Sequence, residues 1–411
     1  PRSTSSAASD VYKRQDELMS ESTIIAGLAR TPMGGMQGDL SEVSAPVLGE
    51  TAIRGALSRA GVSPDQVDET IMGCVLPGGL GQAPARQASI GAGIPESTPC
   101  STVNKMCGSG MKTVMMAHDA INAGSAEVVV AGGMESMTNA PYILPKVRSG
   151  MRLGHGEVLD HMFVDGLEDA FDKGRLMGSF AEDCASKYDF SREAQDAYAI
   201  ESLKRAKNAI DKGLFTEEIE PVKISTRKGD FVIDTDEQPG KAQLDKIPNL
   251  RPAFAKDGTV TAANSSSISD GAAAVVLCSE SKASELGLKP VARILGHSSH
   301  AQAPGWFTTA PVDAIKKLMK KLEWTVEDVD LFEVNEAFAV VPMAAMHDVG
   351  IPHEKLNVRG GACALGHPVG ASGARIIVTL AQALKDSGGK KGVASLCIGG
   401  GEATAVAIEL A

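Results

Sequence analysis

The stretch SGMKTVMMAHDAINAG at residues 109–124 is repeated, in its pattern, as SGARIIVTLAQALKDSG at residues 372–388. Each copy begins with Ser-Gly, carries apolar residues at helical spacing and ends at a glycine, which predicts a helix with a glycine stop. Ser109 corresponds to Ser372, an offset of 263 residues. Self-similarity at a fixed offset predicts that the chain contains two similar structural units.

Two further pairs of segments have nearly the same offset. SPDQVDETIM at 63–72 matches TVEDVDLFEV at 325–334, and VVVAGGME at 128–135 matches ASLCIGGGE at 394–402 after a slightly longer loop. The last two segments are short apolar runs ended by glycines, which is typical of strands buried on both faces of a sheet. The sequence therefore predicts an α/β fold of two like halves, stacked about a pseudo-twofold axis.

A segment at 139–265 has no counterpart in this repeat. It contains a Met- and Gly-rich stretch at 141–163, an amphipathic helical pattern at 191–213 and a charged stretch at 227–241 that we expect to be stranded. Insertions of this size in a duplicated core often form a lid or a platform for substrate.

Composition excludes several classes of protein. The net charge of −11 disfavours nucleic acid as a partner, which needs a basic face. No apolar run is long enough to predict a membrane span. The seven cysteines form no C-x-x-C pair, and the eight histidines show no metal-ligand spacing, so neither a disulfide framework nor a metal site is predicted. We expect a reducing, cytoplasmic location.

The first residues do not fit a secretory signal, because 1–15 lack an apolar core. We interpret residues 1–18 as a non-native or disordered extension and Met19 as the natural start. The alternative is an Arg- and Ser-rich mitochondrial presequence.

Two motifs carry candidate reactive groups next to glycines and helix starts. Cys107 lies in NKMCGSGMK at 104–112, where a helix dipole and backbone N–H groups lower the pKa of a thiol. His367 lies in GGACALGHPVGASGAR at 360–375, a tight turn that would aim the imidazole. Taken alone, each residue could instead be a buried structural cysteine or an ordinary polar contact.

Two more motifs lie at strand ends. Cys397 and Gly399 belong to SLCIGGGEA at 395–403, and N–H groups in such a glycine run can form an oxyanion hole. Asn335 in EVNEAFA at 333–339 follows the predicted strand LFEV, at the edge where α/β sheets place functional groups. A core cysteine and an Asx-type turn are the alternatives.

In this order, the four motifs resemble the thiolase family. The similarity extends from about residue 22 to residue 411 and includes GQAPARQ (81–87), AGGMESM (131–137), LRPAF (250–254) and GTVTAANSSSISDGAA (258–273). The resemblance implies the thiolase fold, with duplicated βαβαβαββ halves in a five-layered α-β-α-β-α core. It implies an N-terminal half at 19–138 with 266–288, an inserted loop domain at 139–265 and a C-terminal half at 289–411.

The resemblance also implies the catalytic roles. Cys107 would become S-acylated, His367 would activate it, and Cys397 would move the proton on the α-carbon of the acyl group. Asn335 would hold a water that forms one oxyanion hole with His367. The N–H groups of Cys107 and Gly399 would form the other.

Acyl-CoA and CoA are the implied substrates, with no further cofactor. The positions expected to contact the acyl and pantetheine groups are Ser266, Leu176, Met177, Ala337 and Phe338. Family members often have His where this chain has Leu176, which leaves the preferred acyl chain length open. Lys228 or Lys241 are candidates for the CoA phosphates.

Similarity to short-chain biosynthetic members implies reversible condensation of two acetyl-CoA into acetoacetyl-CoA and CoA, the reaction of an acetyl-CoA C-acetyltransferase. The alternative is a broader 3-ketoacyl-CoA thiolase of fatty-acid β-oxidation. Decarboxylating condensing enzymes of related fold usually carry a second His at the position of Cys397, and a noncatalytic acyl-CoA-binding protein would lack one of the three reactive residues. PGGLGQ at 77–82 lacks the dinucleotide-loop spacing. A homodimer or homotetramer is implied, with 145–165 as a candidate tetramer contact.

Overall fold

The computed structural model describes residues 22–226 and 229–411. The expected N-terminal extension at 1–18, the expected start at Met19 and the candidate phosphate ligand Lys228 lie outside the described residues.

The described strands form one long mixed sheet in the order β12-β13-β14-β11-β1-β10-β5-β3-β4, with β2 paired to β10. The strands of the N-terminal half are β1 (Thr23–Arg30), β2 (Gly34–Gly35), β3 (Glu69–Gly73), β4 (Cys100–Val103), β5 (Val128–Ser136) and β10 (Ser269–Ser279). Those of the C-terminal half are β11 (Ala292–Ala301), β12 (Leu331–Val334), β13 (Lys391–Ile398) and β14 (Glu402–Leu410). The halves join through a short antiparallel pairing of β1 with β11.

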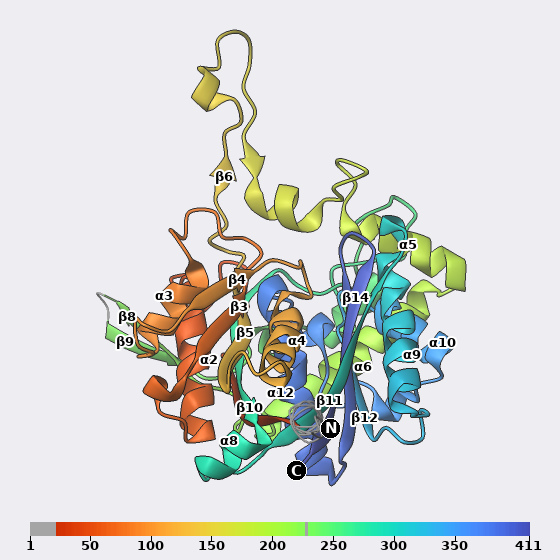
Figure 1. Cartoon of the computed structure of the whole chain (residues 1–411). Coiled ribbons are helices and arrows are strands. Elements are labelled where there is room, and N and C mark those ends of the chain that lie inside the picture. The colour runs from red at the N-terminus through yellow and green to blue at the C-terminus, as the bar shows by residue number, and fades with distance from the viewer. Residues whose placement is uncertain (1–21, 227–228) are drawn as a thin grey trace, which may run out of the picture.

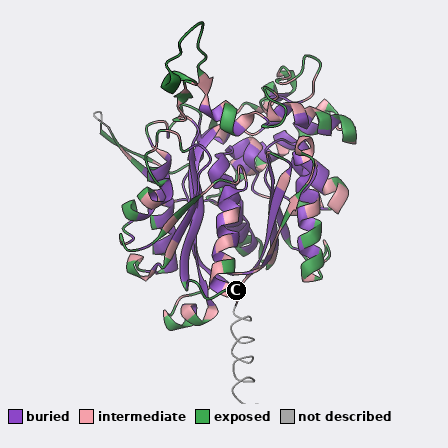
Figure 2. Cartoon of the chain, turned by 45° about the horizontal axis from the view of Figure 1, so that its top comes forward, coloured by how far each residue is buried: buried purple, intermediate pink, exposed green. Residues whose placement is uncertain are grey.

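Helices complete five layers (Figure 1). α4 (Ser109–Asn122) and α12 (Val369–Ser387) pack between the two halves of the sheet. α2 (Ala45–Ala60) and α3 (Pro84–Gly91) cover the outer face of the N-terminal half, and α9 (Ala310–Leu322) and α10 (Val340–Val349) cover that of the C-terminal half. Two short helices, α8 (Glu280–Glu285) and α11 (Ala362–Leu365), lie in connections. Figure 2 shows the middle strands of the sheet and most of α12 buried, whereas α4 is partly exposed, and the expected five-layered α/β architecture is confirmed.

Two aspartates at equivalent positions show the internal duplication. Asp68 Oδ2 accepts the N–H groups at the start of β5, and Asp330 Oδ2 accepts those at the start of β13, all at 2.7–2.9 Å. The two parallel ladders then keep a constant offset, which is 262 between β3 and β12 and 263 between β5 and β13. The match of VVVAGGME to ASLCIGGGE after a longer loop is therefore wrong. β5 continues through its glycines, whereas the glycines after β13 form a turn, so Glu135 corresponds to Ile398.

The repeated Ser-Gly pair sets the separation of the two central helices. A Cβ built on Gly110 would lie 2.9 Å from the N of Ala374, and one built on Gly373 would lie 2.3 Å from the N of Met111. Only glycine permits such an approach of two helix backbones. The motif that reveals the duplication is thus the motif that lets the halves meet.

The inserted segment lies over the edge of both halves (Figure 1). Its elements are β6 (Tyr142–Ile143), β7 (Leu159–Asp160), α5 (Met177–Tyr188), α6 (Arg192–Asp211), β8 (Val222–Thr226), β9 (Gly229–Ile233) and α7 (Glu237–Lys241). The expected α6 begins after Ser191, whose side chain caps it by accepting from the N–H of Ala194. The strand expected over 227–241 ends at Ile233, and the short helix α7 follows from Glu237, where Pro239 has no N–H to give to a strand ladder.

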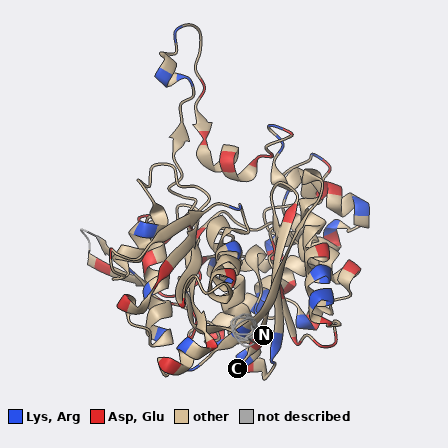
Figure 3. Ribbon diagram, in the orientation of Figure 1, with Lys and Arg blue, Asp and Glu red and all other residues tan. Residues whose placement is uncertain are grey.

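Charged side chains lie mainly on the outer helices and the connecting loops, and the strands between them are largely uncharged (Figure 3). No helix among the described residues is both long enough and apolar enough to cross a membrane.

Candidate active site

A cavity of about 390 Å³ lies where the insertion meets the two halves, and its wall is mostly apolar. Eight of the predicted residues line it: Cys107, Leu176, Met177, Ser266, Ala337, Phe338, His367 and Gly399. Cys397 and Asn335 are not on the wall and are almost wholly buried. The structure thus gathers residues from both halves and from the insertion around one cavity.

Cys107 immediately precedes Gly108, the residue before α4, and follows Met106, which has a positive φ of 48°. Burial raises the pKa of the Cys107 thiol to about 11, while hydrogen bonds from the N–H groups of Gly399 and of Cys107 itself lower it. The predicted net lowering of this pKa is wrong, because the desolvation of the thiolate outweighs the two N–H groups. In the free protein Cys107 is a neutral thiol that needs a base.

Hydrogen bonds assign the protonation of His367. Its Nδ1 lies 2.5 Å from Ser372 Oγ, and that hydroxyl donates to the carbonyl of Pro368 at 3.0 Å. Ser372 must therefore accept from Nδ1–H, which leaves the Nε2 lone pair as the acceptor. Nε2 has no hydrogen-bond partner among the described residues. Burial, and then the charge of Arg375, lower the pKa of His367 to about 3, so the imidazole is neutral at physiological pH.

Cys397, in β13, and Asn335, which immediately follows the neighbouring strand β12, lie behind the cavity wall. Cys397 is wholly buried, and burial followed by the nearby Cys107 sulfur holds its pKa well above the ordinary value. The backbone N–H of Asn335 donates to the carbonyl of Ser395 at 3.0 Å. Neither polar atom of the Asn335 amide has a partner among the described residues. A buried amide of this kind is suited to an ordered water or to a substrate oxygen.

The loop that carries Ser266 is fastened to the segment after β12. Both the N–H and the hydroxyl of Ser266 donate to the carbonyl of Ala337, at 2.9 and 3.0 Å. Glu336, between Asn335 and Ala337, accepts from Ser202 of α6 at 2.7 Å. These bonds hold the insertion against the C-terminal half and fix the shape of the cavity.

A second cavity of about 340 Å³ shares Ala262 and Ser267 with the first. Lys241, one of the two candidates for CoA phosphates, lies on its wall, and so does Lys246, which we did not predict. Lys241 also forms an ion pair with Glu237.

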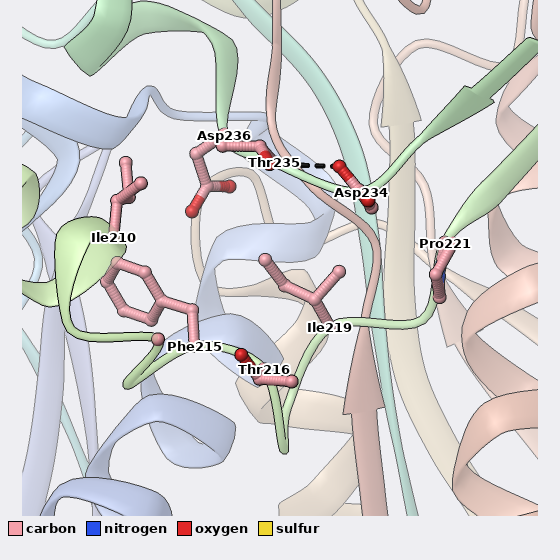
Figure 4. A pocket seen from close by; sticks show the side chains of 9 residues that line it. Ile210, Phe215, Thr216, Ile219, Pro221, Asp234, Thr235 and Asp236 are labelled. Atoms are coloured by element: carbon pink, nitrogen blue, oxygen red, sulfur yellow. Dashed lines mark hydrogen bonds between the residues drawn. The ribbon is translucent and has the colours of Figure 1, made fainter.

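A third cavity, of about 270 Å³, is lined by residues of the insertion between 210 and 236 (Figure 4). Its buried acid is Asp236, whose two oxygens bind Arg30 at 2.7 and 2.8 Å. Because that carboxylate is already neutralised by a bidentate partner, and the other walls are mainly Ile210, Phe215 and Ile219, we assign no chemistry to this cavity.

One group of possible metal ligands forms although the sequence shows no such pattern. His118, Asp119 and His297 bring their ligand atoms within 4.8 Å of one another. His297 Nε2 is paired with Asp119 at 2.8 Å, and both ring nitrogens of His118 are hydrogen-bonded, to Thr23 and Asn122. A metal would have to displace these bonds. His297 is too far from His118 and Asp119 in the sequence for a motif based on residue spacing to detect the group.

Sequence reasoning missed several residues around the active-site cavity. Ser372 orients His367 from the first turn of α12, and a hydroxyl five residues after the histidine was the available signal. Phe254, quoted within LRPAF, and Phe307 add aromatic walls. Glu135, quoted within AGGMESM, received no role, although it is wholly buried beside the reactive loops.

Comparison with known proteins agrees with this geometry. Residues 23–281 match the model of the thiolase N-terminal domain, and residues 288–410 match that of the thiolase C-terminal domain. Acetyl-CoA acetyltransferase 1 of Arabidopsis thaliana is 51% identical over 398 residues, covering 96% of this chain and 95% of that protein. Acetyl-CoA acetyltransferase of Cupriavidus necator is 50% identical over 388 residues, covering 94% of this chain and 98% of that protein.

One solved structure has a closely similar fold. The crystal structure of the Bacillus anthracis acetyl-CoA acetyltransferase has a TM-score of 0.93 and 41% sequence identity, covering 95% of this chain and 99% of that one. Family models cover nearly the whole chain, the relatives are about half identical, and the duplicated fold is the same. This chain therefore belongs to the thiolase family.

Proposed function

We propose that this protein is an acetyl-CoA acetyltransferase, which interconverts two acetyl-CoA with acetoacetyl-CoA and CoA through an S-acetyl-Cys107 intermediate. The observation that carries the proposal is one apolar cavity on which a cysteine thiol, a neutral imidazole and the N–H of Gly399 converge. The names of relatives about 50% identical to this chain support the acetyl substrate over longer acyl chains.

In the first half-reaction, Cys107 attacks the acetyl-CoA carbonyl. His367 Nε2 takes the thiol proton as the bond between the Cys107 sulfur and the acetyl carbon forms. It returns this proton to the CoA sulfur as the bond between the acetyl carbon and that sulfur breaks. The N–H groups of Cys107 and Gly399, which point at the Cys107 sulfur, are suited to bind the oxyanion of the tetrahedral intermediate. A neutral histidine with a free Nε2 is the protonation state that this step requires.

In the second half-reaction, the Cys397 thiol gives its proton to the neutral His367, and the resulting thiolate takes a proton from the methyl group of the second acetyl-CoA. The enolate carbon attacks acetyl-Cys107, the new C–C bond forms, the S–C bond to Cys107 breaks, and the Cys107 thiolate recovers a proton from the protonated His367. Burial makes Cys397 strongly basic once ionised. His367 and a water held by Asn335 would stabilise the enolate oxygen, which needs a hole of its own because it lies apart from the first oxyanion.

We infer that the pantetheine arm follows the cavity past Leu176, Met177 and Ser266, and that the nucleotide lies toward the adjoining cavity. Lys241 and Lys246 there supply positive charge for phosphates. No other cofactor takes part in this chemistry.

We infer that the protein forms a homo-oligomer through the hairpin formed by β6, β7 and residues 144–158. The hairpin projects from the body of the molecule (Figure 1) and exposes apolar side chains, including Leu144, Val158 and Leu153, the last 98% exposed. Apolar residues gathered on a projecting segment favour contact with another subunit.

CoA-dependent cleavage of acetoacetyl-CoA tests the function, compared with longer 3-ketoacyl-CoA substrates in wild type and Cys107→Ala. We expect wild type to cleave acetoacetyl-CoA fastest and Cys107→Ala to be inactive. Faster cleavage of a longer substrate would make the protein a broader 3-ketoacyl-CoA thiolase, and no cleavage by wild type would refute the enzyme. Cys397→Ser should impair condensation more than acylation of Cys107, whereas equal loss of both would contradict the separate roles.

A further inference from the structure

The internal duplication relates the loop that carries Cys107 to an equivalent position in the C-terminal half. At the offset of 263 that β5/β13 and α4/α12 share, Cys107 corresponds to Gly370. Cys107 lies on the wall of the substrate cavity, and its N–H is directed at its own sulfur. The N–H of Gly370 instead donates to Glu135 Oε2 at 2.9 Å. A carboxylate from β5 thus occupies the internal counterpart of the proposed oxyanion hole.

Glu135 is wholly buried and accepts bonds from two separate segments. Besides Gly370, the N–H of Val75 donates to Oε2 at 2.9 Å and the N–H of Leu76 donates to Oε1 at 3.0 Å. The thiol of Cys74 lies 3.6 Å from Oε1. No side chain fits between the partners, since a Cβ on Gly370 would lie 2.6 Å from Oε2.

The two segments whose N–H groups bind Glu135 lie next to Cys107 and His367. Gly370 is three residues after His367, in the first turn of α12. Val75, Leu76 and Val369 belong to one apolar cluster, against which Cys107 packs. The carboxylate therefore ties the wall behind Cys107, which belongs to the N-terminal half, to the turn that carries His367, which belongs to the C-terminal half.

We propose that Glu135 is a positioning residue for the thiolase reaction: its ionised carboxylate joins the two halves and holds His367 at the distance from Cys107 that proton transfer requires. It acts through these residues and touches no substrate. The inference rests on the proposed function.

The bonding pattern favours the ionised form. Oε2 accepts two N–H groups, so its protonation would direct an O–H at an N–H, and protonation of Oε1 would weaken all three bonds by removing the negative charge. Burial raises the pKa of Glu135 to about 7, and the three N–H groups oppose the rise. The titratable side chains that face it are the thiols of Cys74 and Cys107, and its charge contributes to the raised pKa of Cys107. Activity should therefore fall as pH drops through the pKa of Glu135, a range in which His367 stays neutral.

The test is Glu135→Gln, with Asp68→Asn as the matched control. Asp68 also accepts two backbone N–H groups, but at the far end of β5. We expect Glu135→Gln to lower kcat for acetoacetyl-CoA thiolysis about 100-fold, the effect of an ångström-scale misplacement of reacting groups. KM should stay within about threefold, because the cavity wall is intact. The variant should also lose the acid limb of the kcat–pH profile, which a purely structural role would not remove. Asp68→Asn should keep both kcat and the limb.

Glu135→Gln with wild-type kcat, or with the wild-type acid limb, would overturn the proposal while leaving the enzyme assignment intact. Inactive wild type would instead overturn the function itself. If Glu135→Gln does not fold, hydrogen exchange of wild type decides. As pH is lowered, the protection factor of the Gly370 amide should fall over the same pH range as kcat. A protection factor that stays constant over that range would refute the proposal.

Discussion

The clearest mutational prediction concerns the hydrogen bond that orients the base. In Ser372→Ala, the Nδ1–H of His367 loses its acceptor in a site that is wholly buried. An unsatisfied buried donor costs about 1–3 kcal/mol. The tautomer protonated at Nδ1, whose Nε2 is free to act as the base, is therefore destabilised by this amount relative to the tautomer protonated at Nε2. A cost of this size corresponds to a fall in kcat of about 5- to 150-fold.

The assay is steady-state thiolysis of acetoacetyl-CoA, with kcat and KM measured separately. KM should change little, because Ser372 is not on the cavity wall. The control is Ser89→Ala, which removes a buried hydroxyl bonded to Thr70 at 3.0 Å on the outer face of the N-terminal half. Both variants should lose similar stability, but only Ser372→Ala should lose kcat. A Ser372→Ala enzyme with kcat within about twofold of wild type would refute the assigned tautomer.

Three other predictions test separate parts of the account. Alkylation of Cys107 in the free protein should keep accelerating as pH rises toward its pKa of about 11, and a plateau below pH 8 would contradict the dominance of burial. Gly110→Ala should lower the free energy of unfolding by about 1–3 kcal/mol through overpacking, whereas Gly240→Ala, which meets open space, should not. Leu153→Asp should reduce the mass measured by light scattering if the hairpin joins subunits, and an unchanged mass would remove this contact from the proposal.

Much of the fold was predictable because the two copies of the repeat share local sequence patterns. Helical spacing and glycine stops predicted α4 and α12, and continuous apolar runs predicted β5 and β13. Their common offset predicted two halves. The error within the repeat has a local cause, since paired glycines look alike in sequence whether they continue a strand, as in β5, or form a turn, as after β13.

The site was predictable only in part, for a different reason. Cys107 and His367 lie in motifs that combine glycines with helix starts. The contacts that tune them come from elsewhere in the chain. The direction of the Cys107 pKa shift depends on desolvation by the surrounding chain, and the role of Glu135 depends on N–H groups contributed by two distant segments. Backbone donors carry no side-chain signature, so no motif could have revealed this arrangement.

Trapping the covalent intermediate tests the central claim most directly. Wild type, Cys107→Ala and Cys397→Ser would each be mixed with acetyl-CoA, quenched in acid, digested and examined by mass spectrometry. The account predicts one added acetyl group on the peptide containing Cys107 in wild type and in Cys397→Ser, and none in Cys107→Ala. An acetyl group on any other cysteine, or an unmodified Cys107 peptide in wild type that turns over substrate, would contradict it.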